Sequence, residues 1–207
     1  MKLFTYEKAL GAMQGKHVAG CDEAGRGPLA GPLVCAAVVL DPENPISGLD
    51  DSKKLTALKR EALFDEIIEK AKAYAIVELS HEAVDRLNVY QASRQGMIQA
   101  IKDLGIHVDH VLTDAMPLND TMPYTSIIKG DQLSASIAAA SILAKVTRDA
   151  RMHLLAKTYP KYGFERHKGY PTKAHLDALK MFGPCSVHRK SFKPVKDAMI
   201  QVYGLVL

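Results

Sequence analysis

The sequence predicts an α/β protein whose strands come early in the chain and whose helices dominate its second half. Short apolar runs bounded by Gly and Pro alternate with longer segments in which apolar residues recur every three or four positions, which are the spacings of strands and amphipathic helices. The 207 residues, 47% of them hydrophobic, suffice for one core. We therefore expect a single domain, with a core over about residues 1–158 and a helical appendage over about residues 159–207.

The first two strands are expected at residues 17–23 and 33–40. A turn rich in Gly and Pro, with the sequence DEAGRGPLAGP, separates them. Because this turn is too short to hold a crossover helix, the two strands should pair antiparallel.

Helices and strands alternate after this hairpin. Residues 56–71 have apolar positions at helical spacing, and Thr56 can cap the start of that helix. Residues 73–79 predict a strand, and a second helix is expected at residues 89–104, ending at Gly105.

Two later apolar runs each lead to a carboxylate. The segment VDHVLTDA leads to Asp114 and the segment TSIIKGD leads to Asp131, so both are expected to be buried strands that end in an acid. The Ala-, Ile- and Leu-rich segment 134–159 that follows predicts a long, mostly buried helix.

Positive charge is concentrated near the C-terminus. The chain has a net charge of +4, yet residues 157–196 contain ten Lys or Arg against two acidic residues, which leaves −4 on the rest. This segment is expected either to face a polyanion or to be a solvated basic surface, and charge alone does not separate the two.

Targeting signals and disulfide patterns are absent from the sequence. No apolar run approaches the ~20 residues of a membrane span, and the N-terminus lacks the apolar stretch of a signal peptide. The three cysteines are widely separated and form no CxxC pair, so reduced thiols are expected. These features predict a cytoplasmic protein without membrane contact.

Asp22, Asp114 and Asp131 all close apolar strands, an unusual placement for acidic side chains. A carboxylate near a core loses hydration, and close carboxylates repel one another unless a cation lies between them. Hard oxygen ligands favour Mg²⁺ or Mn²⁺, and two such ions can drive phosphodiester hydrolysis. The alternative is structural, since a strand-end Asp also caps turns and helices, and Asp131 precedes a long helix.

Glu23 follows Asp22 directly, and adjacent side chains on a regular strand point to opposite faces. Two explanations stay open. The strand breaks at Glu23, as Gly25 and Gly27 would permit, or Glu23 contributes differently, through a second ion or its main-chain carbonyl.

Five longer segments carry a specific pattern: GCDEAGRGPLAGP at 20–32, DDSKKL at 50–55, SASIAAASILAKVTRD at 134–149, GYPT at 169–172 and HRKSF at 188–192. In content and order they closely resemble ribonuclease HII, and they span nearly the whole chain. The resemblance implies a ribonuclease H-like fold, a mixed central sheet flanked by helices, with a C-terminal helical basic appendage over the substrate.

The resemblance also implies a set of catalytic and metal-binding carboxylates, holding Mg²⁺ or Mn²⁺ with two ions in the working complex. These residues are Asp22, Glu23, Asp114 and Asp131. Asp149 rivals Asp131, but it is expected inside the long helix, in a structural ion pair with Arg148. Ala115 stands where many relatives carry glycine, a departure that concerns loop shape more than chemistry.

Substrate contacts are implied in the same way. The turn Gly25, Arg26 and Gly27 would place backbone groups against a 2′-hydroxyl, because glycine lets the backbone approach the minor groove. Tyr170 would pack on the neighbouring sugar. Candidate phosphate contacts are Lys53, Lys54, Lys145 and Arg189.

The implied enzyme is a monomeric endoribonuclease for RNA/DNA hybrids and ribonucleotide-containing duplex DNA, acting in ribonucleotide excision and primer removal. It would cut 5′ to a single ribonucleotide and leave 5′-phosphate and 3′-hydroxyl ends. The rivals are a non-catalytic hybrid-binding module, a metal phosphatase for small phosphoesters, and the related ribonuclease HIII, which usually replaces the arginine turn. The C-terminal sequence does not decide whether a sliding clamp binds.

Overall fold

The computed structural model describes residues 4–118 and 122–204. Its five strands form one sheet in the order β3-β2-β1-β4-β5. They are β1 (Val18–Ala24), β2 (Leu33–Val39), β3 (Ala73–Leu79), β4 (His110–Asp114) and β5 (Tyr124–Ile127). β1 pairs antiparallel with β2 and parallel with β4, and β4 pairs parallel with β5, so the sheet is mixed.

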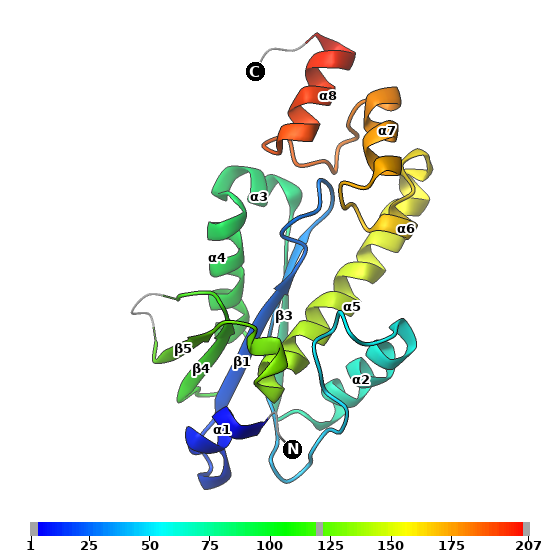
Figure 1. Ribbon diagram of the computed structural model, residues 1–207. Helices are drawn as coiled ribbons and strands as arrows, with labels where there is room; N and C mark the ends of the chain where they lie inside the picture. The colour runs from blue at the N-terminus through cyan, green and yellow to red at the C-terminus, as the bar shows by residue number, and fades with distance from the viewer. Residues whose placement is uncertain (1–3, 119–121, 205–207) are drawn as a thin grey trace. The chain divides into compact units, whose positions relative to one another are not determined.

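Three of the longer helices lie beside this sheet (Figure 1), namely α2 (Ala57–Lys70), α4 (Val89–Lys102) and α5 (Ala135–Thr158). Two further long helices, α7 (Lys173–Phe182) and α8 (Lys193–Tyr203), follow later in the chain. The shorter ones are α1 (Thr5–Ala9), η2 (Ala12–Gln14), α3 (His81–Leu87), η3 (Gly130–Gln132), η4 (Pro160–Tyr162) and α6 (Phe164–His167). Within the described residues, no helix combines the length and apolar character needed to cross a membrane.

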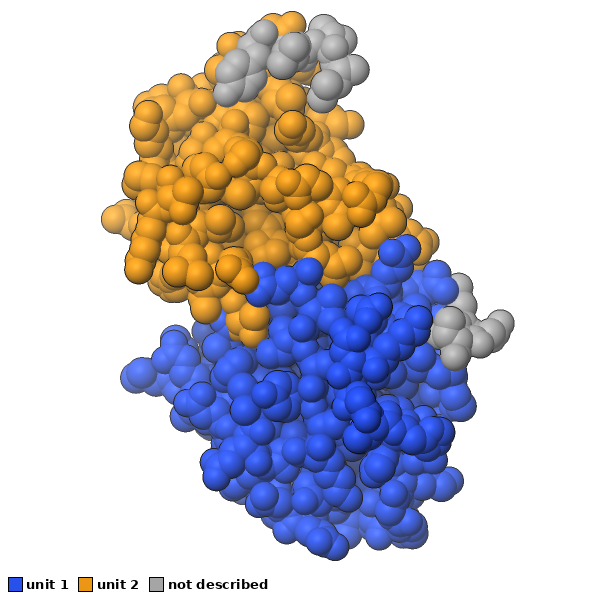
Figure 2. All heavy atoms as spheres, turned by 180° about the vertical axis from the view of Figure 1, so that it is seen from behind, with its two compact units in different colours: residues 1–24, 34–78, 93–146 blue, residues 25–33, 79–92, 147–207 orange. Residues whose placement is uncertain are grey.

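The chain forms two compact units, which Figure 2 colours separately. Unit 1 comprises residues 1–24, 34–78 and 93–146, and unit 2 comprises residues 25–33, 79–92 and 147–207. Unit 2 therefore contains the segment expected as a C-terminal appendage, together with the Gly-rich turn that follows β1.

The core of unit 1 follows the alternation of the strands. Val34, Ala36 and Val38 of β2 join α2 and α5 in one buried cluster. On the opposite face, the thiol of Cys35 lies 3.6 Å from the carbonyl oxygen of Ser93 in α4. The sheet is thus covered on both faces, as its continuous apolar strands require.

Gly20 brings β1 and α5 unusually close together. A Cβ built at Gly20 would lie 2.1 Å from the backbone carbon of Ser136. Since no side chain fits there, glycine sets the distance between the strand that carries Asp22 and the helix that follows Asp131.

Most expected elements are present, with two differences. Thr56 caps α2 as predicted, its hydroxyl accepting from the amide of Lys59 at 3.3 Å. The first difference is α3, which begins after Ser80 and was not expected from the sequence. The expectation that Asp131 ends a strand is wrong, because β5 ends at Ile127 and Asp131 lies in the short helix η3.

Unit 2 has two small apolar clusters of its own. Leu29 of the Gly-rich turn packs with Leu179 of α7 and Val195 of α8. Ala30 of the same turn packs with Met152 and Phe164. The turn is therefore packed against helices of unit 2 through both clusters.

Candidate active site

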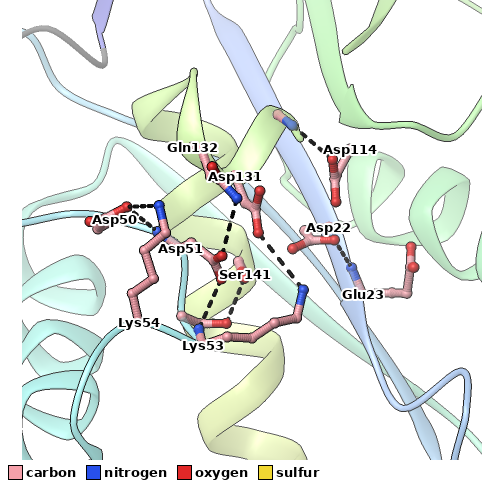
Figure 3. A network of polar contacts seen from close by, with 12 residues as sticks. Asp22, Glu23, Asp50, Asp51, Lys53, Lys54, Asp114, Asp131, Gln132 and Ser141 are labelled. Atoms are coloured by element: carbon pink, nitrogen blue, oxygen red, sulfur yellow. Dashed lines mark hydrogen bonds and ion pairs between the residues drawn. The ribbon is translucent and has the colours of Figure 1, made fainter. Parts of the chain in front are cut away.

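Three carboxylates from different elements of unit 1 converge, as Figure 3 shows. Asp22 comes from β1, Asp114 from the end of β4, and Asp131 from η3. One carboxylate oxygen of each lies within 4.8 Å of the other two. The parallel pairing of β1 with β4 explains the first part of this arrangement, because it places the carboxyl ends of both strands at the same edge of the sheet.

The third carboxylate reaches the group through a tight turn. Lys129 has a left-handed backbone with φ of 58°, and the chain enters η3 directly after it. The amide of Gly130 then donates to Oδ1 of Asp114 at 2.8 Å. This bond ties the segment that carries Asp131 to the end of β4.

Burial and repulsion raise the pKa of two of these carboxyls. Asp22 is 5% exposed; loss of hydration, followed by the charges of Glu23 and Asp114, raises its pKa well above the ordinary value. Loss of hydration, followed by the charge of Asp114, raises the pKa of Asp131 to about 6. Both shifts mean that the ionised cluster is costly without a compensating cation.

The donor set fits a hard divalent cation. All three groups offer carboxylate oxygens, and no thiol or imidazole belongs to the cluster within the described residues. Oxygen-only ligands favour Mg²⁺ or Mn²⁺ over softer transition metals.

The structure shows whether the strand breaks at Glu23, which the sequence left open. Glu23 stays within β1, paired with Cys35 of β2, so the strand does not break at this residue. Its amide donates to Oδ1 of Asp22 at 2.7 Å. The cluster of three carboxylates does not include its side chain. The backbone amide of Glu23 therefore orients the carboxylate of Asp22, and this role does not depend on the side chain of Glu23.

The segment DDSKKL places a lysine at the cluster. Nζ of Lys53 lies 3.9 Å from Oδ2 of Asp131. Desolvation lowers the pKa of Lys53, but the nearby acids, chiefly Asp131 and Asp51, outweigh it and raise that pKa. The site thus includes an exposed ammonium group beside the carboxylates.

Asp51 is a buried acid that the sequence analysis missed. It is 6% exposed, its Oδ1 accepts from the amide of Lys53 at 2.9 Å, and its Oδ2 accepts from Gln132 at 3.3 Å. The doublet Asp50-Asp51 before two lysines was the available signal. Lys54 pairs with Asp50 at 3.5 Å.

The expected recognition turn and Tyr170 lie together in unit 2. Arg26 and Gly27 are exposed, whereas Gly25 is buried. A Cβ built at Gly27 would lie 3.4 Å from Cε1 of Tyr170, whose side chain is half-exposed. The backbone at Gly27 and the ring of Tyr170 therefore form one surface. Lys145, another expected contact, lies partly buried on α5.

Two buried arginines hold this turn. Arg148 donates to the carbonyl oxygens of Pro32, Ala30 and Lys168 at 3.0 to 3.3 Å. The guanidinium of Arg189 donates to the carbonyl oxygens of Gly31 and Arg26 at 3.1 to 3.2 Å. Each arginine thus supports the turn through backbone carbonyls.

These contacts correct one expectation and add to another. Arg189 is completely buried, which does not fit a phosphate contact, and we reassign it to holding the turn. Arg148, expected in an ion pair with Asp149, also binds these carbonyl oxygens. Neither role could be predicted from the sequence, because a residue pattern does not show which backbone carbonyls accept a hydrogen bond.

Comparison with known proteins agrees with this geometry. A family model described as Ribonuclease HII matches residues 19–195. Ribonuclease HII of Bacillus cytotoxicus is 51% identical over 197 residues, covering 95% of this chain and 76% of the relative.

Two solved structures are also similar. Ribonuclease H2 from Pyrococcus horikoshii matches with a TM-score of 0.74 and 28% identity, covering 87% of this chain and 96% of that chain. RNase HII of Archaeoglobus fulgidus, solved in complex with PCNA, matches with a TM-score of 0.75 and 26% identity over the same shares.

The mixed sheet, the carboxylate cluster and these similarities define a hydrolytic nuclease with a ribonuclease H-like fold. The chain belongs to the ribonuclease HII family, whose members are metal-dependent endoribonucleases that degrade RNA in RNA/DNA hybrids.

Proposed function

We propose that this protein hydrolyses the RNA strand of RNA/DNA hybrids and cuts duplex DNA on the 5′ side of an embedded single ribonucleotide. Cleavage leaves 5′-phosphate and 3′-hydroxyl ends. The observation that carries the proposal is the convergence of Asp22, Asp114 and Asp131 within 4.8 Å of one another. Buried acids that repel each other are costly in a purely structural role and useful around a cation.

The carboxylates of Asp22, Asp114 and Asp131 would hold Mg²⁺ or Mn²⁺, with Glu23 completing the catalytic set. When bound, two such ions lower the pKa of a water nucleophile and stabilise the departing 3′-oxygen. The amides of Glu23 and Gly130 orient the carboxylates of Asp22 and Asp114. Lys53 adds a cation beside Asp131, suited to a phosphate oxygen of the substrate.

Unit 2 would supply substrate selection. The exposed turn at Arg26 and Gly27 is proposed to present backbone groups to the 2′-hydroxyl of the ribonucleotide, which is the group that distinguishes RNA from DNA. Tyr170 would pack on the adjoining sugar. Lys54 and Lys145 are proposed as phosphate contacts, which position a duplex without reading its bases. An enzyme with this substrate selection would serve in ribonucleotide excision and in the removal of RNA primers. We propose that it acts as a monomer.

The test uses a labelled DNA duplex that contains one ribonucleotide. Wild-type protein should cut it 5′ to that residue in Mg²⁺ or Mn²⁺ and stop in chelator, and Asp22→Asn should bind the duplex without cutting. Chelator-resistant cleavage by pure protein would refute the metal scheme.

Two rival functions predict different outcomes. A non-catalytic hybrid-binding module would bind the duplex in both proteins and cut it in neither. A phosphatase for small phosphoesters would not need the basic segment 157–196, so a steep fall of duplex binding with salt would exclude it.

A further inference from the structure

The short N-terminal helix α1 buries one acidic side chain. Glu7 is 0% exposed, although its neighbours Tyr6 and Lys8 are exposed. Glu7 lies upstream of the segment matched by the family model, residues 19–195. Burying a carboxylate is costly unless hydrogen bonds and favourable dipoles compensate it, so its position requires an explanation.

The partners of Glu7 lie at the start of α5. Its Oε1 accepts from the hydroxyl of Ser134 at 2.6 Å and from the amide of Ser136 at 2.9 Å, and also from the hydroxyl of Ser136. A negative charge at the N-terminus of a 24-residue helix also interacts favourably with the helix dipole. Glu7 therefore fixes the first turn of α5 from a segment 127 residues away in sequence.

Ser134 connects Glu7 to the carboxylate cluster. Its amide donates to the carbonyl oxygen of Gly130 at 2.8 Å, and its hydroxyl accepts from the amide of Ile137 at 3.2 Å. The amide of Gly130 in turn donates to Asp114 at 2.8 Å. Asp131 is the next residue along the chain. One short segment thus joins Glu7 to two members of the cluster.

We propose that Glu7 is a positioning residue of the metal site, which sets the placement of Asp131 and Asp114 through Ser134 and Gly130. This inference rests on the proposed metal-binding role of those carboxylates. It assigns the N-terminal helix a part in metal affinity, beyond its part in covering the core.

The first experiment measures Mn²⁺ binding by calorimetry in the full-length protein without substrate. Glu7→Gln keeps the size of the side chain but replaces a charged acceptor by a weaker, neutral one. We expect Mn²⁺ affinity to fall about tenfold, at the low end of the range for residues that orient metal ligands. The control is Glu69→Gln, an exposed position on α2, which should bind Mn²⁺ as wild type does.

The substrate affinity of each protein, measured in chelator, should be unchanged, because Glu7 is proposed to act on the metal site alone. A role confined to stability would lower the unfolding temperature and leave Mn²⁺ affinity, measured well below that temperature, unaltered. Normal Mn²⁺ binding by folded Glu7→Gln would overturn the inference. Absence of Mn²⁺ binding by wild type would instead overturn the proposed function.

Ser134→Ala provides a second test that leaves Glu7 in place. It removes the hydroxyl that links Glu7 to the Gly130 segment, while the amide of Ser136 still donates to Oε1 of Glu7. We expect this variant to weaken Mn²⁺ binding as well, and the double variant to be no weaker than Glu7→Gln alone, since both act on one path. Wild-type affinity in Ser134→Ala, or fully additive losses, would contradict the proposed path.

Discussion

The acidic residues of the site are held by backbone amides and by a buried environment. Asp22 and Asp114 each accept a main-chain donor, from Glu23 and Gly130 respectively. Such bonds favour the ionised form, whereas burial disfavours it more strongly and raises the pKa of Asp22. The hydrogen bond thus orients the carboxylate of Asp22, while burial makes its negative charge unfavourable. A bound cation would compensate that charge.

Ala115, directly after Asp114, has a backbone φ of 50°. A side chain in this left-handed region costs roughly 1 to 2 kcal/mol, and glycine loses somewhat more entropy on folding. Ala115 is exposed, so its methyl group contributes little packing. We expect Ala115→Gly to raise the free energy of unfolding by up to ~1 kcal/mol in urea denaturation, without loss of cleavage.

Ala62→Gly is the control for that substitution. It lies at an exposed position inside α2, where glycine should lower stability by about 1 kcal/mol. If both variants were destabilised equally, backbone strain at Ala115 would not be the explanation.

Gly25 combines positive φ with a close contact. Its φ is 102°, and an added Cβ would lie 2.1 Å from Nε of Arg148 and 2.9 Å from the carbonyl oxygen of Pro32. We expect Gly25→Ala to lose ~2 kcal/mol of stability or more, as overpacking and strain act together. The displaced turn should also raise the KM for a duplex with one embedded ribonucleotide.

Gly15→Ala separates backbone strain from steric overlap of the added methyl group. Gly15 has φ of 87° but nothing within 4 Å of an added Cβ, so it measures strain alone. Equal losses of stability in both variants would mean that Arg148 and Pro32 yield easily to the new methyl group.

At the scale of elements, the close packing of α5 on β1 determines where Asp22 stands relative to Asp131. Gly20→Ala would place a methyl group 2.1 Å from the backbone of Ser136, and backbone cannot move as a flexible side chain does. We expect a loss of about 1 to 3 kcal/mol from overpacking, together with a higher Mn²⁺ concentration for half-maximal cleavage. Unchanged metal dependence in the folded variant would show that the cluster tolerates a shift of α5.

The sequence predicted the elements whose signal is local. β1 and β2, their antiparallel pairing and the cap at Thr56 all follow from short patterns, and the structure confirms them. It did not predict α3, a seven-residue helix with one buried side chain and therefore little periodic signal. It also misplaced Asp131 at a strand end, because the turn at Lys129 depends on contacts with β4.

The same limit applies to the site. Asp22 and Asp114 stood out because acids at the ends of apolar strands are conspicuous. Asp51 and the two turn-holding arginines did not, because their partners are backbone groups or residues far away in sequence. Residues that act on a reactive group are therefore easier to predict than those that position it.

At the scale of the whole molecule, the two units carry different parts of the proposed chemistry. Unit 1 holds the carboxylate cluster and Lys53, and unit 2 holds the Gly-rich turn and Tyr170. Substitutions in unit 1 should therefore change metal dependence first, and substitutions in unit 2 should change substrate selection first.

The pH dependence of stability should disappear when metal is bound. In chelator, the folded-state pKa of Asp131, about 6, exceeds its ordinary value of 3.8, so the folded protein binds more protons between these values. Its contribution therefore lowers the free energy of unfolding as pH rises from about 4 to 6, and the raised pKa of Asp22 acts in the same direction.

Saturating Mg²⁺ binds the ionised carboxylates and removes the extra protons of the folded state, so this decline of stability with pH should disappear. Asp131→Asn isolates the effect, because both proteins share every other titrating group. In chelator, the stability of wild type relative to Asp131→Asn, measured by urea denaturation at several pH values between 4 and 7, should decline as pH rises. Mg²⁺ should abolish that decline and raise the stability of wild type relative to the variant. A stability difference that is independent of both pH and Mg²⁺ would mean that Asp131 is neither strained in the apo protein nor a ligand in the loaded one.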